Sequence, residues 1–373
     1  MALRVFDLSF LKPGVRPQII QGMKLRDLLR VLARNGFVVD APCLGRLAYL
    51  LVLGTLNSIY GACETALNGR RVRSVEIDPS PLFILGHWRS GTTHLHNLLS
   101  LDRNLACPTV FQSLFPHHFL VTQIAAGLFN RIGPERRPMD NMAFSAFGPH
   151  EDEFALAAHS TVSPYIRFLF PITGDPGYSE LDPKLLSEEA LERWKKSFIL
   201  FMKKLRLLNE RRIVLKSPPH LARVGTLLEI FPQAKFVHIV RDPYRVYVST
   251  RKLWADGLSA AHLQMPQSEL VDEIIFSWYI QLFSLFERDR QLIPPGSLCE
   301  IKFEDLEARP IETLNEIYEG LDLPGFELLE ERLKVYLRSV ASYRKNTYDL
   351  AETDREKVRS LWRTNFERYG YPV

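Results

Sequence analysis

The sequence predicts an α/β fold in which a central parallel β-sheet is covered by helices on both faces. Two observations support this. From residue 212 onward, apolar runs of strand length alternate with segments of helical periodicity. The same pattern occurs at residues 82–99, where LFIL precedes a short polar loop and a leucine-spaced helix. Because parallel strands need crossover connections, this alternation indicates βαβ units.

The region before the first strand reads as helical and ends in the charged, proline-bearing connection RRVRSVEIDPSP. We therefore expect an N-terminal helical extension, residues 1–78, followed by a main domain, residues 79–373. In the extension, MKLRDLLRVLAR (residues 23–34) sets a leucine stripe against basic residues. Such a helix either packs on its own protein, which is the usual case, or lies on an anionic membrane surface.

The most apolar stretch, LAYLLVLGTL at residues 47–56, is shorter than the ~20 residues that cross a bilayer. We expect it to form a second packed helix.

The remaining elements follow from periodicity and capping signals. Residues 101–185 are rich in Phe, Pro and His and show no clean period, whereas residues 187–209 begin with a Ser187 cap and continue with helical spacing. The predicted strands are residues 82–85, 212–217, 235–240 and 298–303; the predicted helices also include residues 219–230, 243–254 and 268–288.

Ligands of parallel sheets bind beyond the carboxyl ends of the strands. In this chain those ends are residues 86–93, 216–218 and 241–243, and we expect them to converge.

The first of these segments, GHWRSGTT (residues 86–93), is a strand-to-helix turn. Such a turn directs the free N–H groups of a helix start, and the positive end of the helix dipole, at an anion. A nucleotide-binding GxxxxGK[ST] loop would carry a Gly-Lys pair, which is missing here; Arg89 supplies the cation instead. The loop is therefore P-loop-like and suited to phosphate.

WRSGTT resembles the 5′-phosphosulfate loop of sulfotransferases, which reads PKSGTT in cytosolic members and PRSGTT in the tyrosylprotein branch. The resemblance implies a P-loop-like three-layer fold and 3′-phosphoadenosine 5′-phosphosulfate (PAPS) as co-substrate. It also implies donor contacts from the residues of this loop, which are Arg89, Ser90, Gly91, Thr92 and Thr93.

Two later segments strengthen the resemblance. VRDPYRVYVS places Arg241 and Ser249 at the spacing with which the family holds the donor's 3′-phosphate. LKSPPHLARVGTLLEIFPQAKFVHIVRDP resembles the tyrosylprotein branch and matches Lys216 to a lysine that acts on the sulfonate; a lysine snorkelling from a strand end is the alternative. Arg344 and Lys345, in SYRKNTYDL, either complete the 3′-phosphate site or form a solvated basic turn.

The sequence also departs from the family pattern. His94 stands where cytosolic members place a tryptophan that stacks on adenine, and ACPTVFQ lacks the glutamate of the tyrosylprotein branch. For the catalytic base we choose Glu151, then Glu153, then His150, from PHEDEF, whose apolar flanks would raise carboxylate pKa values. If the segment is extended, Glu151 and Glu153 point to opposite sides. The histidines His94, His96, His117, His118, His159 and His220 rank below this cluster.

We thus predict a PAPS-dependent sulfotransferase that acts on a hydroxyl or, less favoured, an amine. The acceptor is expected to be an apolar small molecule, because phenylalanines lie between the two donor segments: Phe111, Phe115, Phe119, Phe129, Phe144, Phe147 and Phe154. The alternative, that they form core, stays open. Two other functions are an atypical nucleotide-dependent phosphotransferase, requiring magnesium, and a nucleotide-binding scaffold without turnover.

Composition limits the setting. The net charge of +4, with acids and bases mixed, does not indicate nucleic-acid binding. Carboxylates are not paired at metal-ligand spacing, so we expect no metal. Four dispersed cysteines and the lack of a signal-peptide pattern predict a cytoplasmic protein, with membrane association through residues 23–34 as an option. The oligomeric state is not readable.

Overall fold

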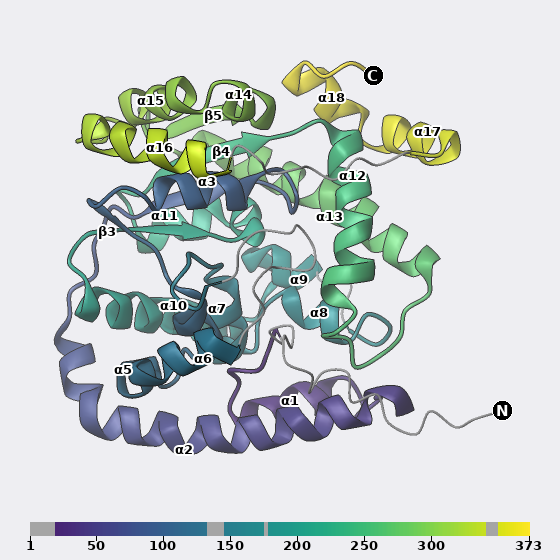
Figure 1. Ribbon diagram of the computed structural model, residues 1–373. Helices are drawn as coiled ribbons and strands as arrows, with labels where there is room; N and C mark the ends of the chain where they lie inside the picture. Colours follow the sequence, from purple (N-terminus) through teal and green to yellow (C-terminus); the bar gives the residue numbers. More distant parts are fainter. Residues whose placement is uncertain (1–18, 133–144, 175–177, 341–349) are drawn as a thin grey trace. The chain divides into compact units, whose positions relative to one another are not determined.

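The computed structural model describes residues 19–132, 145–174, 178–340 and 350–373 (Figure 1). The chain forms two compact units. Unit 1 comprises Met1–Ile77, Pro108–Glu210 and Leu253–Asp272, and unit 2 comprises Asp78–Cys107, Arg211–Lys252 and Glu273–Val373. The predicted boundary at residue 78 coincides with the start of unit 2. The helices before it nevertheless cluster with later segments of unit 1, and so do not form an extension of their own.

Unit 2 contains the predicted sheet. Within the described residues it has five parallel strands in the order β2-β3-β1-β4-β5. The strands are β1 (Leu82–Leu85), β2 (Leu105–Ala106), β3 (Arg212–Lys216), β4 (Lys235–Val240) and β5 (Leu298–Lys302). The α/β class with a parallel sheet is therefore confirmed. Strand β2 was not predicted, because two residues are too few to show a period.

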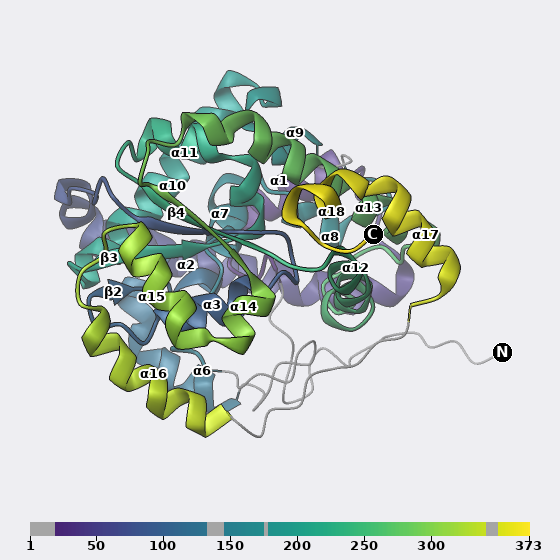
Figure 2. The same ribbon diagram turned by 90° about the horizontal axis from the view of Figure 1, so that it is seen from above.

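Helices cover both faces of this sheet, which makes unit 2 a three-layer structure. On one face Leu82 and Ile84 pack with leucines of α3 and with residues of α15 and α16 in one apolar cluster. On the other face Phe83 contacts Phe231, at the end of α11, with ring centroids 5.9 Å apart. Figure 2 shows α11 and α15 on opposite sides of the strands.

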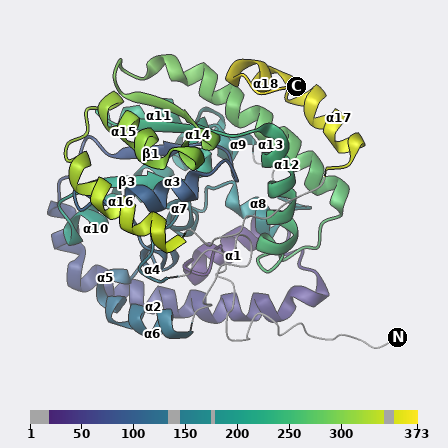
Figure 3. The same cartoon turned by 45° about the horizontal axis from the view of Figure 1, so that its top comes forward.

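The helices of unit 2 follow the predicted order. Figure 3 shows α17 and α18 beside α12 and α13. The elements are α3 (Thr92–Leu99), η5 (Pro218–Ala222), α11 (Val224–Ile230), α12 (Pro243–Lys252), α13 (Ser268–Asp289), η7 (Arg290–Leu292), α14 (Phe303–Ala308), α15 (Pro310–Gly320), α16 (Phe326–Val340), α17 (Glu352–Leu361) and α18 (Arg363–Tyr369). The helix predicted at residues 219–230 is split, because its Pro-Pro start forms a 3-10 turn.

Unit 1 is helical. Its elements are α1 (Leu25–Arg34), η2 (Ala41–Cys43), α2 (Leu44–Ser74), α4 (Val110–Leu114), α5 (Phe119–Thr122), η3 (Gln123–Ala125), α6 (Ala126–Ile132), α7 (Glu153–Ser160), α8 (Tyr165–Leu169), α9 (Tyr178–Leu181), η4 (Pro183–Leu185), α10 (Glu188–Leu208) and the π-helical η6 (Leu253–Leu258). Helix α10 packs on α7 and α2. Its predicted cap is confirmed, since Ser187 accepts a hydrogen bond from Ala190 N–H.

The two N-terminal helices differ from each other. The stripe of α1 is turned inward, with Leu28, Val31 and Leu32 buried, so this helix packs on its own protein. The stretch at residues 47–56 is part of the much longer α2. In the described part of the chain, Ala41–Ser74 is one helix whose length and composition would allow it to cross a membrane. The expectation of a second packed helix is confirmed, because α2 packs on α1 and α10. The helix is longer than the apolar stretch that predicted it and continues well beyond residue 56.

Candidate active site

Three strand ends of unit 2 meet as predicted. β1 lies between β3 and β4 in the sheet, so the loop after it is flanked by the residues that end its two neighbours. Lys216 Nζ, at the end of β3, donates to Thr93 Oγ1 at 3.2 Å. Arg241 Nη1, just after β4, donates to the main-chain oxygen of Arg89 at 3.2 Å. The structure thus brings the loop, the lysine and the arginine together.

The loop has a backbone that only glycine fits at two positions. A Cβ on Gly91, whose φ is 101°, would lie 2.2 Å from the ring of Phe303. A Cβ on Gly86 would lie 2.7 Å from Ile239 O and from Ser90 Oγ. Ser90 Oγ in turn donates to His87 O at 2.8 Å, and this hydrogen bond within the loop stabilises its conformation. The glycines therefore allow close packing beneath the loop.

Helix α3 begins at Thr92, with Gly91 as its N-cap residue. The first N–H groups of a helix have no partner within the helix and carry the positive end of its dipole. The predicted donor residues Ser90 to Thr93 occupy this helix start. They are therefore placed to hold the phosphate oxygens of a nucleotide.

Arg89, in the predicted 5′-phosphosulfate loop, contacts Ser249, a residue predicted to bind the 3′-phosphate. Its Nε donates to Ser249 Oγ, on α12, at 2.8 Å, and Ser249 is only 4% exposed. Arg89 also adopts a left-handed conformation, with φ 68°, which is uncommon for a residue other than glycine. Arg89, predicted to be both catalytic and donor-binding, therefore forms one cluster with Ser249 and Arg241, the two residues predicted for the 3′-phosphate.

The environment of Arg241 is electropositive and partly dry. Burial lowers the pKa of Arg241; Glu304 and Glu307 oppose that effect, and the nearby Arg89 adds to it. The guanidinium carbon stands 4.2 Å from the centroid of the Phe303 ring, a cation–π contact. Arg241 and Arg89 interact electrostatically, and two such cations together favour a multiply charged anion such as a phosphate.

Lys216 is nearly inaccessible, at 2% exposure. Its ammonium is directed to Thr93 at the helix start. A cation at this position lies beside the first N–H groups of α3, so both would act on the same anion. Lys216 is thus placed as a point charge next to the loop rather than in the solvent.

Phe303 is a site residue that the sequence analysis missed. Its ring packs against the backbone of Gly91 and against the guanidinium group of Arg241. The centroid of the ring lies 6.4 Å from that of His94. The strand prediction of residues 298–303 absorbed Phe303 into β5, although the residue begins α14 instead. A signal was available, because Phe303 is the last residue of the predicted strand, and the carboxyl ends of parallel strands meet at one sheet edge.

Arg344 and Lys345 lie outside the described residues. Their part in a 3′-phosphate site stays a prediction.

The acidic cluster belongs to unit 1. Glu153 is the first residue of α7 and is fully buried, and its Oε1 accepts from Ser163 Oγ at 2.6 Å. Glu151 is partly exposed and accepts from the Tyr165 hydroxyl. An extended segment was therefore the wrong premise, because a helix begins at Glu153. Both carboxylates are held by the short segment at residues 163–165.

His150 lies beside this cluster. Its main-chain N–H donates to Pro108 O at 2.8 Å, and its ring is 4.5 Å from that of Phe154. Phe154 also contacts Tyr165, at 5.4 Å between ring centroids. The carboxylate of Glu151 thus lies among aromatic rings. Glu151 is partly exposed to solvent, whereas Glu153 is fully buried.

Most of the other histidines considered as bases are buried structural groups. His118 bonds Asn57 Oδ1 at 3.0 Å and Thr122 Oγ1 at 2.8 Å. Burial, followed by the charge of Lys204, lowers the pKa of His118 to about 4. His220 is fully buried, with its ring edge-on to Phe83. These contacts favour packing roles over proton transfer.

The phenylalanines predicted to line an acceptor pocket have different surroundings. Phe111, Phe115 and Phe129 pack on one another with ring centroids 5.0–5.9 Å apart. Phe119 is core, Phe147 is exposed, and Phe144 lies outside the described residues. An aromatic cluster therefore exists in unit 1.

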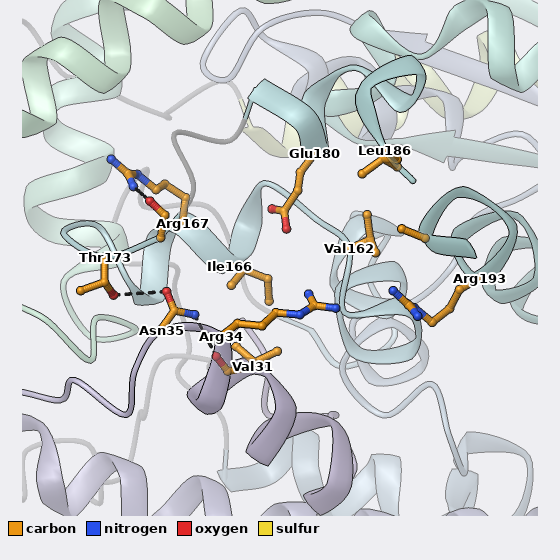
Figure 4. Close-up of a pocket in the computed structure, with 12 residues that line it drawn as sticks. Val31, Arg34, Asn35, Val162, Ile166, Arg167, Thr173, Glu180, Leu186 and Arg193 are labelled. Carbon is orange, nitrogen blue, oxygen red and sulfur yellow. Dashed lines mark hydrogen bonds between the residues drawn. The ribbon is translucent and has the colours of Figure 1, made fainter. Parts of the chain in front are cut away.

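A polar cavity of about 270 Å³ lies elsewhere in unit 1 (Figure 4). Arg34 and Arg193 reach into it from α1 and α10, together with Glu180. Their guanidinium groups are already used on main-chain oxygens: Arg34 Nη1 donates to Thr161 O and Arg193 Nε to Ser160 O, both at 3.0 Å. None of the predicted site residues lines this cavity, and Arg34 and Arg193 both hold the carboxyl end of α7.

Comparison with known proteins agrees with this geometry. A model of the sulfotransferase family matches residues 81–327. The omega-hydroxy-beta-dihydromenaquinone-9 sulfotransferase Stf3 of Mycobacterium bovis is 38% identical over 351 residues, covering 94% of this chain and 90% of the relative. The protein of that name from Mycobacterium tuberculosis matches equally well.

Solved structures support the fold. Sulfotransferase STF1 from Mycobacterium tuberculosis has a TM-score of 0.64 at 19% identity, covering 91% of both chains. Sulfotransferase STF9 from Mycobacterium avium has a TM-score of 0.61 at 17% identity, covering 94% of this chain and 98% of that one. The chain belongs to the sulfotransferase family and is an enzyme that transfers a sulfuryl group.

Proposed function

We propose that this enzyme transfers the sulfuryl group of PAPS to a hydroxyl on an apolar, lipid-like small molecule. The observation that carries the donor assignment is the cluster of Arg89, Arg241 and Ser249 beside the start of α3. One anion would lie at the helix start and a second at the cluster. PAPS has two such groups, the 5′-phosphosulfate and the 3′-phosphate.

The acceptor class is supported by two observations. The 38% identical relative is named for a hydroxylated menaquinone derivative, an apolar molecule with a hydroxyl at its end. In this chain, phenylalanines cluster in unit 1, and Phe154 contacts Tyr165, which donates to Glu151. An aromatic wall beside a carboxylate suits an apolar acceptor whose one polar group is the reacting hydroxyl.

In the proposed reaction the acceptor oxygen attacks the sulfur, and the bond between sulfur and the 5′-phosphate oxygen breaks. Negative charge then develops on the leaving phosphate, where Lys216 and the N–H groups of Ser90 to Thr93 stabilise it. Glu151 takes the acceptor proton as general base, because it is the accessible carboxylate of its cluster. The products are the sulfated acceptor and 3′-phosphoadenosine 5′-phosphate.

Arg89 has two proposed roles. Its hydrogen bond to Ser249 favours a role in holding the 3′-phosphate, while its place in the loop favours the leaving group. Arg89→Ala would lower donor affinity in the first case. In the second it would lower turnover at saturating donor.

We also propose a cytoplasmic location. The four cysteines, all in described parts of the chain, are free thiols, as expected in a reducing compartment.

The test is a transfer assay with labelled PAPS and a panel of acceptors: ω-hydroxylated prenylquinols, sterols, phenols and carbohydrates. We expect label in the prenylquinols and little in carbohydrates. Label in carbohydrates alone would overturn the acceptor class. Slow release of 3′-phosphoadenosine 5′-phosphate without an acceptor would separate an enzyme lacking its substrate from an inactive scaffold. Phosphate transfer from ATP with magnesium would instead favour a phosphotransferase.

A further inference from the structure

Helix α2 has an inverted distribution of polar and apolar residues. Its inward face holds the buried polar residues Arg46, Asn57 and Glu64 and two glycines, and only two apolar residues of this fully described helix, Leu50 and Val72, are buried with them. Its outward face holds Leu67, 72% exposed, and Val52, 61% exposed. Other exposed residues of this face are Leu44, Leu56, Ile59 and Tyr60. A helix on the water-facing surface of a protein normally has the opposite arrangement.

The outward face also lacks charge over a long distance. Between Arg46 and Arg70 the helix contains one charged residue, Glu64, and that residue is buried at 3% exposure. Residues 47–69 span ~34 Å of helix. A continuous uncharged, apolar strip of this length on a protein surface marks an interaction site. We call the strip formed by Leu44, Val52, Leu56, Ile59, Tyr60 and Leu67 the α2 outer face.

The inward face fixes α2 to the rest of unit 1. Asn57 Nδ2 donates to Met23 O at 3.0 Å. Glu64 Oε2 accepts from Leu120 N–H at 2.7 Å, and Glu64 forms an ion pair with the buried Lys204. Crossing a bilayer would break these buried polar contacts. The helix therefore stays on the protein, and only its outer face is available to a partner.

The charges at the end of α2 point to the kind of partner. Arg70, Arg71 and Arg73 are all exposed at its C-terminal end. Arginines beside an apolar helix face are the pattern of helices that lie in an anionic membrane surface, where they meet lipid phosphates. A second copy of the chain fits less well. In the fully described stretch 41–69 the sole acidic residue is the buried Glu64, so the outer face itself offers no counter-charge to the arginines of a second copy.

We propose that the α2 outer face lies in the surface of an anionic phospholipid bilayer, with its apolar side chains among the acyl chains. The proposal concerns a surface of unit 1 and does not rest on the identity of the acceptor. It moves the membrane contact from residues 23–34, where Leu28, Val31 and Leu32 are buried against the protein, to the neighbouring helix.

The test is co-sedimentation of the full chain with vesicles of phosphatidylcholine and phosphatidylglycerol, with pure phosphatidylcholine vesicles beside them. The wild type should sediment with the anionic vesicles. Leu56→Glu/Ile59→Glu, and separately Leu67→Glu, should lower the partition by about tenfold or more, because charges would enter the apolar layer. The matched control is Leu328→Glu, a change at a 71% exposed leucine of unit 2, which should sediment as the wild type does.

A second pair of variants tests the charge. Arg70→Glu/Arg71→Glu should remove the preference for anionic over neutral vesicles. Circular dichroism verifies that each variant folds; the single change Leu67→Glu serves as the informative variant if the double change unfolds.

Two outcomes would overturn the proposal. The first is a wild type that stays in the supernatant with anionic vesicles, or that sediments equally well after the α2 substitutions. The second is a concentration-dependent dimer, seen by light scattering and abolished by Ile59→Glu, in a protein that ignores vesicles. That result would assign the outer face to a second copy.

Discussion

The donor loops of unit 2 and the acidic cluster of unit 1 are built in different ways. In unit 2 each predicted residue stands at or just after a strand end, and the parallel sheet determines where those ends meet. In unit 1 Glu151 and Glu153 are positioned by side-chain hydrogen bonds to Tyr165 and Ser163, between short helices. The backbone determines the first site, whereas particular side chains determine the second.

This difference has a consequence for mutation. A site held by the backbone fails when the backbone is forced to move, even if every charged group remains. A site held by side chains fails when one carboxylate is changed, and two neighbouring carboxylates can have separate roles in chemistry and in stability.

The largest effect is expected in unit 1, from Glu151→Gln. A general base contributes about 10²–10⁴-fold to rate, so turnover should fall by at least about a hundredfold while donor affinity is unchanged. The matched variant is Glu153→Gln. Because Glu153 is fully buried and accepts from Ser163, this change should lower the melting temperature more than the turnover.

Steady-state kinetics with calorimetric donor binding would measure both variants. If Glu153→Gln abolished turnover in a folded protein while Glu151→Gln did not, the roles would be reversed. If both kept normal turnover, the base would lie outside this cluster.

A smaller but still large effect is expected in unit 2 from Gly91→Ala. The added Cβ would lie 2.2 Å from the Phe303 ring, so the loop must shift. The N–H groups at the start of α3 would then no longer point at the donor phosphate. We expect donor affinity to fall by about ten- to a hundredfold and the free energy of unfolding by about 1–3 kcal/mol. Gly296→Ala is the control, because Gly296 also has a positive φ but open space around it. Equal donor affinities in the two variants would contradict a site held by its backbone.

A further effect, on stability alone, concerns pH. Burial lowers the pKa of His87 in unit 2 to about 4, and that of His118 in unit 1 to about 4. Between pH 6.5 and 4 the unfolded chain binds a proton at each histidine that the folded chain does not bind. Stability is therefore complete above pH 6.5 and falls as the pH decreases through this range.

Each histidine should contribute no more than about 3 kcal/mol to this loss. Melting temperatures from pH 7.5 to 4.5 would measure it, and His87→Gln and His118→Gln should each flatten the dependence. Whichever substitution flattens it more identifies the histidine whose pKa differs more between the folded and the unfolded chain. A wild-type stability that rises on acidification would contradict the burial of both rings as neutral groups.

The sheet and the donor loops were the parts most readable from sequence. Strands buried on both faces are continuous apolar runs, so β1 and β4 could be assigned to the residue. The anion-binding role of the loop after β1 could be predicted because its glycines and hydroxyl residues directly determine its backbone conformation. The convergence of Lys216 and Arg241 on it followed from the geometry of parallel sheets.

The parts that were misread depend on contacts between distant residues. Phe303 was assigned to a strand because periodicity does not show where β5 ends. The start of α7 at Glu153 was missed because the segment was taken as extended, although Asp152 stands at the N-cap position of the helix. The outward side of α2 could not be read because its buried polar residues find partners, such as Lys204, far away in the sequence.

The most direct test of the donor site is calorimetric titration with 3′-phosphoadenosine 5′-phosphate and with adenosine 5′-phosphate. Arg241→Ala and Ser249→Ala should each weaken the bisphosphate by about ten- to a hundredfold, the value of a charged hydrogen bond. The same variants should leave the monophosphate nearly unchanged, and Arg245→Ala, an exposed arginine of the same helix, should affect neither. Equal losses for the two nucleotides would contradict the assignment of Arg241 and Ser249 to the 3′-phosphate.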